Sequence, residues 1–306
     1  MKAGAPIPPE SIRALAVIGA GQMGSGIAQV AAASGFSVRL FDSNRDHASA
    51  AKAQIGARFQ RLVDKGQLSA EASAEHSARV EVAGFDAALA DADFVIEAAT
   101  ENRALKLELF RQIDAATPAH AVLASNTSSL SITLLAGATR RPGQVLGMHF
   151  MNPVPLMQLV ELVRGLQTSS ETLELGRKLA LRFGKTVIVS QDSPGFLVNR
   201  VLIPLINEAC FALQEGVGTP EDIDLGVRLG LNHPMGPLEL ADLIGLDTVL
   251  AIAEVLQQDL GDDKYRPATL LRNRVAAGWL GKKTRRGFYA YDSRGEKLGG
   301  TQSRTA

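Results

Sequence analysis

Short apolar runs alternate with longer helical stretches over the N-terminal part of the chain, and this alternation limits the possible folds more than any other feature. Residues 23–34 have the composition of a helix, and residues 102–116 carry Leu105, Leu109 and Ile113 at helical spacing. Strands are predicted at residues 14–18, 37–41, 94–97, 122–124, 145–149 and 186–189. Because each helix returns the chain to the same end of the sheet, the pattern predicts an α/β fold whose mostly parallel sheet is covered on both faces.

The pattern changes at the segment 190–195, where serine, proline and glycine interrupt regular structure. Beyond it only helices are predicted: 196–215, one opened by Thr219 as N-cap with Pro220 in first position, 237–243, 248–260 and 267–279. A chain of 306 residues also exceeds the usual size of one core. We predict one domain over residues 1–191 and an all-helical C-terminal domain over 192–306. We expect disorder from about residue 293, where Gly, Ser, Thr and charged residues dominate.

A glycine-rich turn joins the first predicted strand to the first predicted helix. Gly19, Gly21 and Gly24 follow an apolar run, with Gln22 and Met23 between the last two glycines. In the dinucleotide-binding fingerprint the first glycine permits a tight turn, the second lets the backbone approach a pyrophosphate, and the third lets helix and strand pack closely. The phosphates would then meet the N–H groups at the helix N-terminus. The turn predicts a Rossmann-type domain, and the alternative is a tight turn without a ligand.

Asp42 makes the cofactor prediction more specific. It ends the second predicted strand, where an acid can bind the 2′-hydroxyl of a ribose. Its charge would repel a 2′-phosphate, which favours NAD over NADP. Arg45 lies close in sequence and could soften that preference.

His149 and Glu161 are the candidate catalytic pair. His149 lies at the end of the predicted strand 145–149, where α/β sheets place ligands. Imidazole takes up and releases protons near neutral pH. Glu161, expected on a returning loop, could hold the ring as a proton acceptor. A histidine at a strand end is also commonly part of a hydrogen-bonded core, and the residues alone leave both interpretations open.

Two further polar positions are candidates. Ser128 lies in the segment 125–130, directly after the predicted strand 122–124, so its hydroxyl would lie at the ligand-binding edge of the sheet. Alternatively, Ser128 or Ser129 caps the helix that begins near residue 132. Asn199 lies early in the first helix of the second domain, where its amide could equally bond to a neighbouring helix.

The composition excludes several classes of protein. Lys plus Arg and Asp plus Glu number 32 each, which gives no global charge for binding nucleic acid or an acidic membrane surface. No apolar stretch approaches the roughly 18 residues of a membrane span. The single cysteine, Cys210, forbids an intrachain disulfide, and the proline-broken start lacks the pattern of a signal peptide. We expect a cytoplasmic protein without a metal site.

Several motifs in one order resemble the short-chain L-3-hydroxyacyl-CoA dehydrogenases, including bacterial 3-hydroxybutyryl-CoA dehydrogenases. The resemblance covers about residues 12 to 291 and is more specific than the glycine turn alone. The motifs are 19–24 with 26–29, 96–102, 125–130, 147–155 with 160–161, 192–200, 232–237, and 281–284 with 287–289.

The resemblance implies an NAD-dependent enzyme that reversibly oxidises a short-chain 3-hydroxyacyl-CoA in acyl-CoA metabolism. His149 would take the proton of the 3-hydroxyl while hydride passes to the nicotinamide, and Glu161 would orient the imidazole. Ser128 and Asn199 would hydrogen-bond the reacting oxygens of the acyl group. The remaining cofactor surroundings implied are Ser128, Glu101, Lys106, Asn152 and Lys283.

The phosphates of coenzyme A require positive charge, and Lys52, Arg58, Arg61 and Lys65 follow Asp42 in a helical stretch. Arg58, Arg61 and Lys65 are spaced to lie on one face of the helix. A charged face that contacts only solvent is an equally good interpretation of these residues.

The second domain is predicted to form most of a homodimer interface. Residues 201–206 and 238–244 are apolar on more than one helix face. A domain of about 100 residues cannot bury all of that surface alone.

Other functions remain open from the sequence. The same fold and base could act on 3-hydroxyadipyl-CoA or on a non-CoA alcohol, as in related gulonate or carnitine dehydrogenases. A non-catalytic protein resembling a lens crystallin of this superfamily is a third possibility. His233 is the competing candidate for the base.

Overall fold

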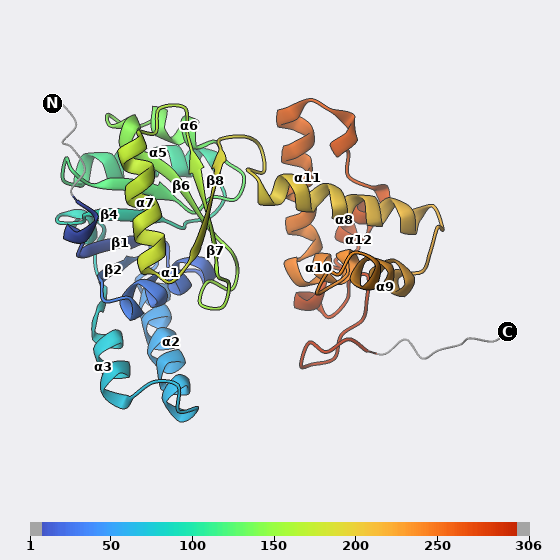
Figure 1. Cartoon of the computed structure of the whole chain (residues 1–306), viewed down its shortest axis with the longest axis horizontal. Coiled ribbons are helices and arrows are strands. Elements are labelled where there is room, and N and C mark those ends of the chain that lie inside the picture. Colours follow the sequence, from blue (N-terminus) through green and yellow to red (C-terminus); the bar gives the residue numbers. More distant parts are fainter. Residues whose placement is uncertain (1–7, 299–306) are drawn as a thin grey trace. The chain divides into compact units, whose positions relative to one another are not determined.

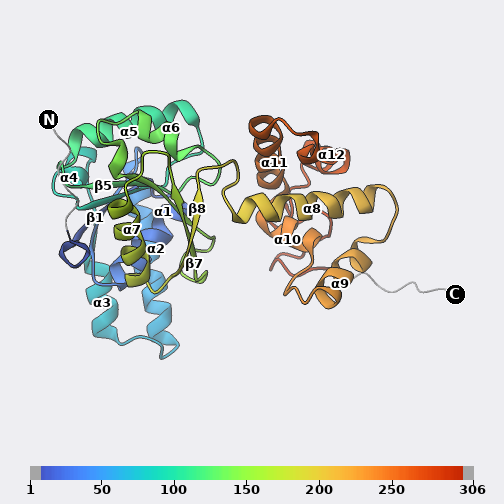
Figure 2. The same cartoon turned by 45° about the horizontal axis from the view of Figure 1, so that its top comes forward.

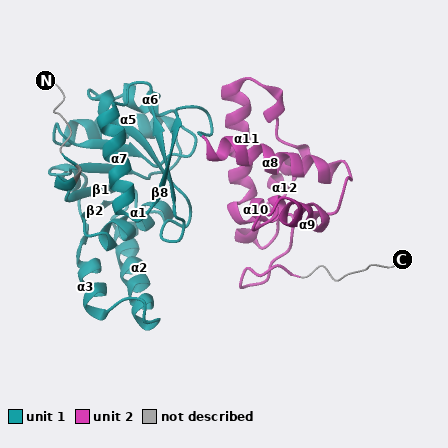
Figure 3. Cartoon of the chain, in the orientation of Figure 1, with its two compact units in different colours: residues 1–196 teal, residues 197–306 magenta. Residues whose placement is uncertain are grey.

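The chain divides into two compact units, residues 1–196 and 197–306, of which the computed structural model describes residues 8–298 (Figure 3). The sequence-based boundary near residue 191 falls where the last strand of unit 1 ends. Unit 1 extends to Phe196 because this side chain, 4% exposed, belongs to the same buried cluster as Ile132 and Val163.

The described part of unit 1 contains an eight-stranded sheet in the order β3-β2-β1-β4-β5-β6-β7-β8 (Figure 1). Neighbouring strands run parallel except β6 and β7, which are antiparallel. The strands are β1 (Ala14–Ile18), β2 (Ser37–Phe41), β3 (Val80–Val82), β4 (Phe94–Glu97), β5 (Val122–Ser125), β6 (Val145–Phe150), β7 (Leu159–Arg164) and β8 (Thr186–Gln191). The strand order reverses between β1 and β4, and doubly wound folds bind ligands at the carboxyl ends of the strands beside that point.

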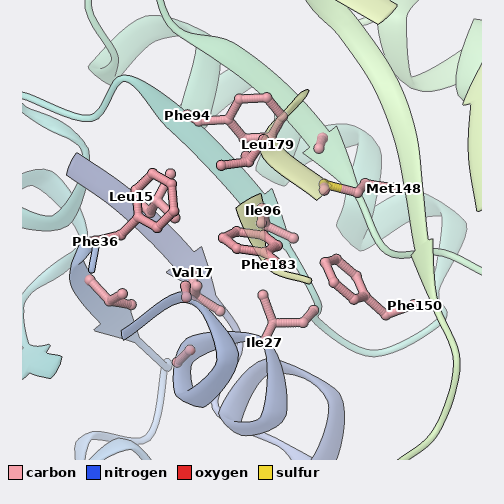
Figure 4. Close-up of a cluster of buried hydrophobic side chains, with 14 of the residues drawn as sticks. Leu15, Val17, Ile27, Phe36, Phe94, Ile96, Met148, Phe150, Leu179 and Phe183 are labelled. Atoms are coloured by element: carbon pink, nitrogen blue, oxygen red, sulfur yellow. The ribbon is translucent and has the colours of Figure 1, made fainter. Parts of the chain in front are cut away.

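Helices cover both faces of this sheet because alternate side chains of each strand point to opposite sides. Leu15 and Val17 of β1 join a cluster with Ile27 and Leu179 from two helices (Figure 4). Ile18 points the other way, into a second cluster. The helices are α1 (Gln22–Ala33), α2 (Arg45–Asp64), α3 (Ala70–Ala78), α4 (Phe85–Leu89), α5 (Arg103–Ala116), α6 (Ile132–Gly137) and α7 (Ser170–Arg182). Figure 2 shows α5 and α6 together on one side of the sheet.

The mostly parallel sheet followed by a helical domain confirms the predicted fold class. Two strands, β3 and β7, were not predicted. The sequence analysis expects Glu161 on a returning loop, whereas it lies within β7, paired with β6 and β8.

Unit 2 is helical. Its helices are α8 (Val198–Gln214), α9 (Pro220–Gly230), α10 (Pro237–Ile244), α11 (Leu246–Leu260) and α12 (Thr269–Ala276). Ile206, Leu238 and Leu246 contribute to the core that these helices enclose. Among the described residues of the chain, no helix has the length and apolar character needed to cross a membrane.

Two buried carboxylates fasten the C-terminal segment of unit 2 to its helices. Asp242 of α10 accepts hydrogen bonds from the backbone N–H groups of Phe288 and Tyr289, at 2.8 and 2.9 Å, and from the Tyr291 hydroxyl at 2.9 Å. Asp224 of α9 accepts a bond of 2.7 Å from the Tyr289 hydroxyl. Burial raises the pKa of Asp242, and these hydrogen bonds lower it only in part.

The chain after Tyr291 remains ordered for several residues. Asp292 accepts hydrogen bonds from the backbone N–H groups of Arg294 and Glu296, at 2.8 and 2.9 Å, and Leu298 donates to Ala290. The expected disorder from about residue 293 therefore does not apply to residues 293–298. The rest of that tail, 299–306, lies outside the described residues.

Candidate active site

The glycine turn between β1 and α1 has the geometry that a bound pyrophosphate requires. Gly19 has φ 104°, and a Cβ added at Gly24 would lie 1.8 Å from the carbonyl oxygen of Gly19. By contrast, a Cβ at Gly21 would meet nothing within 4 Å. No side chain of the described residues caps the first turn of α1, so the N–H groups at that helix end can bind an anion. The residues at the turn therefore fit a dinucleotide.

Asp42 connects the end of β2 to this turn. Its Oδ2 accepts a hydrogen bond of 2.8 Å from the backbone N–H of Ala20, and its Oδ1 accepts one of 2.9 Å from that of Asn44. Each oxygen of a carboxylate can accept a second hydrogen bond, which matches the hydroxyls of a ribose. Arg45 is exposed at the start of α2.

A pocket beside this turn has a volume of about 350 Å³. Of the four basic residues considered for coenzyme A, only Arg58 lines it; Lys52, Arg61 and Lys65 do not. The guanidinium of Arg58 donates to Gln29 Oε1 at 3.2 Å. The remaining residues lining the pocket are Ala20, Gly21, Gln22, Ser25, His47, Ala50, Ala51 and Gln54.

His149 and Glu161 form a buried pair across β6 and β7. His149 Nδ1 lies 3.1 Å from Glu161 Oε2, and the side chains are 9% and 0% exposed. The imidazole ring also stands edge-on to Phe196, with ring centroids 5.9 Å apart. A buried carboxylate against Nδ1 favours the tautomer that carries its proton there, so Nε2 keeps the lone pair that can accept a proton.

Ser128 lies in a loop after β5 that a single carboxylate organises. Glu101 Oε1 accepts hydrogen bonds from the backbone N–H of Ser128 at 2.9 Å and from its Oγ at 3.3 Å. It also accepts from the Thr127 hydroxyl at 2.5 Å and from Ser129 N–H at 3.2 Å. Helix α6 is capped instead by Ser131, whose side chain accepts from Leu134 N–H at 3.1 Å. The capping alternative for Ser128 and Ser129 is therefore wrong.

The surroundings of Glu101 keep it ionised. Burial raises the pKa of its carboxyl, but the charge of Lys106 and hydrogen bonds from Thr127 and Ser128 outweigh burial, so the pKa lies below its ordinary value. Lys106 Nζ lies 3.3 Å from Glu101 Oε2. Glu101 and Lys106, both implied by the resemblance, are thus brought together with Ser128.

Asn152 follows β6 on a loop that is fixed to the glycine-turn helix. The Lys185 ammonium, 7% exposed, donates to the carbonyl oxygens of Val154 and Met157 at 2.7 and 2.8 Å. A Cβ at Gly26 of α1 would lie 2.9 Å from the Cβ of Val154. Helix α1 and the loop after His149 therefore pack closely together.

The remaining predicted site residues belong to unit 2. Asn199, 8% exposed, is the second residue of α8. Lys283 Nζ forms an ion pair with both carboxylate oxygens of Asp247, at 2.6 Å each. His233, the competing base, is exposed in the connection between α9 and α10.

Sequence reasoning did not single out Glu97, Ser125 or Lys185. Glu97 ends an otherwise apolar strand. A charged residue at the end of such a strand is the sequence feature that could have identified it as part of the site.

A doubly wound sheet with a glycine turn at its switch point and a histidine–glutamate pair at its carboxyl edge defines a dinucleotide-binding oxidoreductase. Residues 14–193 match the NAD-binding domain of 3-hydroxyacyl-CoA dehydrogenase, and residues 195–291 match its C-terminal domain. The chain therefore belongs to the 3-hydroxyacyl-CoA dehydrogenase family. It is an NAD-dependent oxidoreductase, as the resemblance implied.

Individual relatives agree along nearly the whole chain. A probable 3-hydroxybutyryl-CoA dehydrogenase of Bacillus subtilis is 52% identical over 283 residues, covering 92% of this chain and 99% of the relative. The crystal structure of (S)-3-hydroxybutyryl-CoA dehydrogenase from Ralstonia eutropha is 49% identical, with a TM-score of 0.89, and the match covers 92% of this chain and 100% of that one. A 3-hydroxyadipyl-CoA dehydrogenase of Escherichia coli is 42% identical, over 94% of this chain and 60% of the relative.

Proposed function

We propose that the protein reversibly oxidises short-chain L-3-hydroxyacyl-CoA thioesters, such as 3-hydroxybutyryl-CoA, to 3-oxoacyl-CoA, as in fatty acid β-oxidation. The observation that carries the proposal is the buried pair of His149 and Glu161, in the sheet whose glycine turn follows β1. Relatives named as 3-hydroxybutyryl-CoA dehydrogenases, 51% and 52% identical, support the choice of substrate.

His149 Nε2 is the atom proposed to take the proton of the 3-hydroxyl group. Glu161 is proposed to hold Nδ1–H and to stabilise the imidazolium that forms, because a buried carboxylate favours the charged ring. Ser128 and Asn199 would hydrogen-bond the reacting oxygens, which keeps the hydroxyl oriented toward His149. NAD, when bound, accepts the hydride.

NAD is proposed to be held by two groups of residues. The turn Gly19, Gly21, Gln22, Met23 and Gly24 would bind its pyrophosphate, and Asp42 its ribose. The fit of the glycine turn supports this assignment. Glu101, Lys106, Ser128, Asn152 and Lys283 are proposed to complete the cofactor surroundings.

Arg58 is the basic residue best placed to attract a phosphate of coenzyme A, since it alone of the four candidates lines the pocket at the glycine turn. Lys65, which follows the last turn of α2, is a weaker candidate because it is exposed and does not line that pocket.

A spectrophotometric panel tests the proposed reaction. NADH formation is measured with L-3-hydroxyacyl-CoAs of graded length, with 3-hydroxyadipyl-CoA, and with free 3-hydroxy acids. We expect the highest kcat/KM with 3-hydroxybutyryl-CoA and no turnover of free acids. Faster turnover of 3-hydroxyadipyl-CoA would move the assignment to the dicarboxylate, as for the Escherichia coli relative. Turnover of a free acid alone would contradict a thioester substrate.

We infer that unit 2 carries the main interface of a homodimer. Its helices expose large apolar side chains: Val201 on α8 is 67% exposed, and Leu225 and Leu229, one turn apart on α9, are 46% and 71% exposed. Exposed apolar groups of this kind commonly mark protein interfaces. Sedimentation at micromolar concentration should give a dimer, and Leu229→Glu should shift it toward monomer, whereas Leu105→Glu in unit 1 should not. A monomeric wild-type protein would contradict the inference.

A further inference from the structure

A second carboxylate, Glu97, is buried at the end of β4 and has no part in the mechanism above. Its side chain is 0% exposed. Oε1 accepts hydrogen bonds of 2.6 Å from the Ala99 backbone N–H and from Lys106 Nζ, and Oε2 accepts one of 2.6 Å from the Ser125 hydroxyl. Strand β4 lies between β1, which leads into the glycine turn, and β5, which leads into the Ser128 loop.

One arm of this network reaches Ser128 through two charged groups. Lys106, 1% exposed, pairs with Glu97 Oε1 and also lies 3.3 Å from Glu101 Oε2. Glu101 in turn accepts both the N–H and the hydroxyl of Ser128. Lys106 therefore pairs with two carboxylates, and of these Glu101 bonds directly to Ser128.

The other arm reaches the same loop through a hydroxyl. Ser125, 0% exposed, donates to Glu97 Oε2, and its Oγ accepts the backbone N–H of Thr127 at 3.2 Å. The backbone N–H of Asn126 donates to the carbonyl oxygen of Glu97 at 2.7 Å. Asn126 Oδ1 in turn accepts the N–H of Phe150, the residue after His149, at 2.9 Å. The loop is thus tied both to Glu97 and to the strand that carries the candidate base.

We propose that Glu97 is a positioning residue that fixes the Ser128 loop for the dehydrogenase reaction, through Lys106 on one side and Ser125 on the other. The inference rests on the proposed function, because it assumes that Ser128 contacts the reacting oxygen. A neutral side chain at position 97 would leave the buried Lys106 with Glu101 as its main counter-ion, since a buried charge requires a partner. Glu101 would then be drawn toward Lys106 and away from Ser128.

The decisive variant is Ser125→Ala, which removes one arm and leaves every charge in place. We expect kcat for 3-hydroxybutyryl-CoA to fall about tenfold or more, because small displacements of orienting groups cost large factors in rate. The KM for NAD and the affinity for NADH, measured by fluorescence titration, should change less than kcat, because the glycine turn and Asp42 are unaltered. Ser73→Ala is the matched control, since Ser73 is a buried serine, 6% exposed, in the remote helix α3.

Glu97→Gln tests the charged arm. Its amide keeps the shape of the side chain but cannot neutralise Lys106, so kcat should fall further than in Ser125→Ala. If Glu97→Gln does not fold, the kinetics of Ser125→Ala alone test the proposal.

The possible results distinguish a positioning role of Glu97 from a role in protein stability, and both from a failure of the proposed reaction. A lower kcat in Ser125→Ala, with a melting temperature equal to that of Ser73→Ala, supports the inference. Unchanged kcat in Ser125→Ala overturns it, as does a loss of kcat that only follows the fraction of unfolded protein. If the wild-type protein oxidises no 3-hydroxyacyl-CoA, the proposed function fails first and the positioning role fails with it.

Discussion

His149 and Glu161 occupy the same register position of the antiparallel pair β6 and β7, so their side chains are direct cross-strand neighbours on one face of the sheet. Side chains at such positions have Cβ atoms about 5 Å apart, which is enough for a hydrogen bond between long polar groups. A slip of one residue would turn Glu161 to the opposite face. The single antiparallel pairing in the described sheet is therefore what places an acid beside the candidate base.

Replacing His149 by glutamine should remove the proton acceptor while keeping a polar side chain of similar reach. We expect kcat to fall by on the order of a hundredfold or more, the usual scale for a general base. Fluorescence titration should show nearly unchanged NADH affinity, because the glycine turn lies elsewhere. His233→Gln is the control and should retain activity. The reverse result, with His233→Gln inactive and His149→Gln active, would move the base to unit 2.

Glu161→Gln should also lower kcat, since it keeps the shape of the side chain but removes the charge that stabilises the imidazolium. Because His149 and Glu161 act as a unit, their losses should not add. The double variant should be about as slow as His149→Gln alone. Steady-state kinetics of all three variants checks this, and a double variant that loses the product of the two single losses would rule out the pair as a unit.

Asp42 should give a clear preference for NAD over NADP in kcat/KM. Asp42→Asn should lower kcat/KM with NAD about tenfold, the scale of one lost hydrogen bond to a charged group, and should narrow the ratio between the two cofactors. Asp46→Asn, an exposed acid of the same segment, serves as control. A wild-type preference for NADP would contradict the assignment and direct attention to Arg45.

Asp114 should make the stability of unit 1 depend on pH. Burial raises the pKa of Asp114, but hydrogen bonds from Arg140 and Arg141 outweigh burial and lower it below its ordinary value of about 4. A carboxyl whose folded pKa is lowered stabilises the fold above its unfolded pKa, and this stability is lost as pH falls through the folded pKa. Asp114→Asn should therefore lower the free energy of unfolding by about 1–3 kcal/mol at neutral pH, and the difference from wild type should shrink below about pH 4.

Thermal melting of wild type and Asp114→Asn across this pH range measures the difference. Asp259→Asn, an exposed acid on α11, should melt like wild type throughout. A difference between Asp114→Asn and wild type that stays constant down to pH 3, about one unit below the ordinary pKa, would contradict the ionic origin of the effect.

Much of the fold follows from local sequence. The bounds of β1, β2 and β4 agree with the predicted strands. Strands β1 and β4 are buried on both faces and therefore appear as apolar runs between breakers. Helix α9 begins as predicted, with Thr219 accepting the N–H of Asp222 at 3.1 Å. Strand β3 has only three residues and depends on pairing with β2, so its own residues give little sign of it.

The candidate site was less predictable where it depends on contacts between distant segments. The hydrogen bonds from residues 127–129 to Glu101 join the loop after β5 to the segment after β4, and no local pattern indicates them. The face shared by Arg58, Arg61 and Lys65 follows from helical spacing, but only the tertiary structure selects Arg58 as the one beside the glycine turn.

The carboxylate contacts of Asp224 and Asp242 have a consequence for synthesis of the chain. Their partners Phe288, Tyr289 and Tyr291 come after every α-helix of unit 2. Until those residues leave the ribosome, Asp242 lacks the three donors that offset its burial. Asp224, which already accepts the backbone N–H groups of Leu238 and Glu239, lacks only the Tyr289 hydroxyl. Unit 1, whose sheet is complete by Gln191, has no such dependence. We therefore expect the cofactor domain to fold during translation and the helical domain to close only at its end.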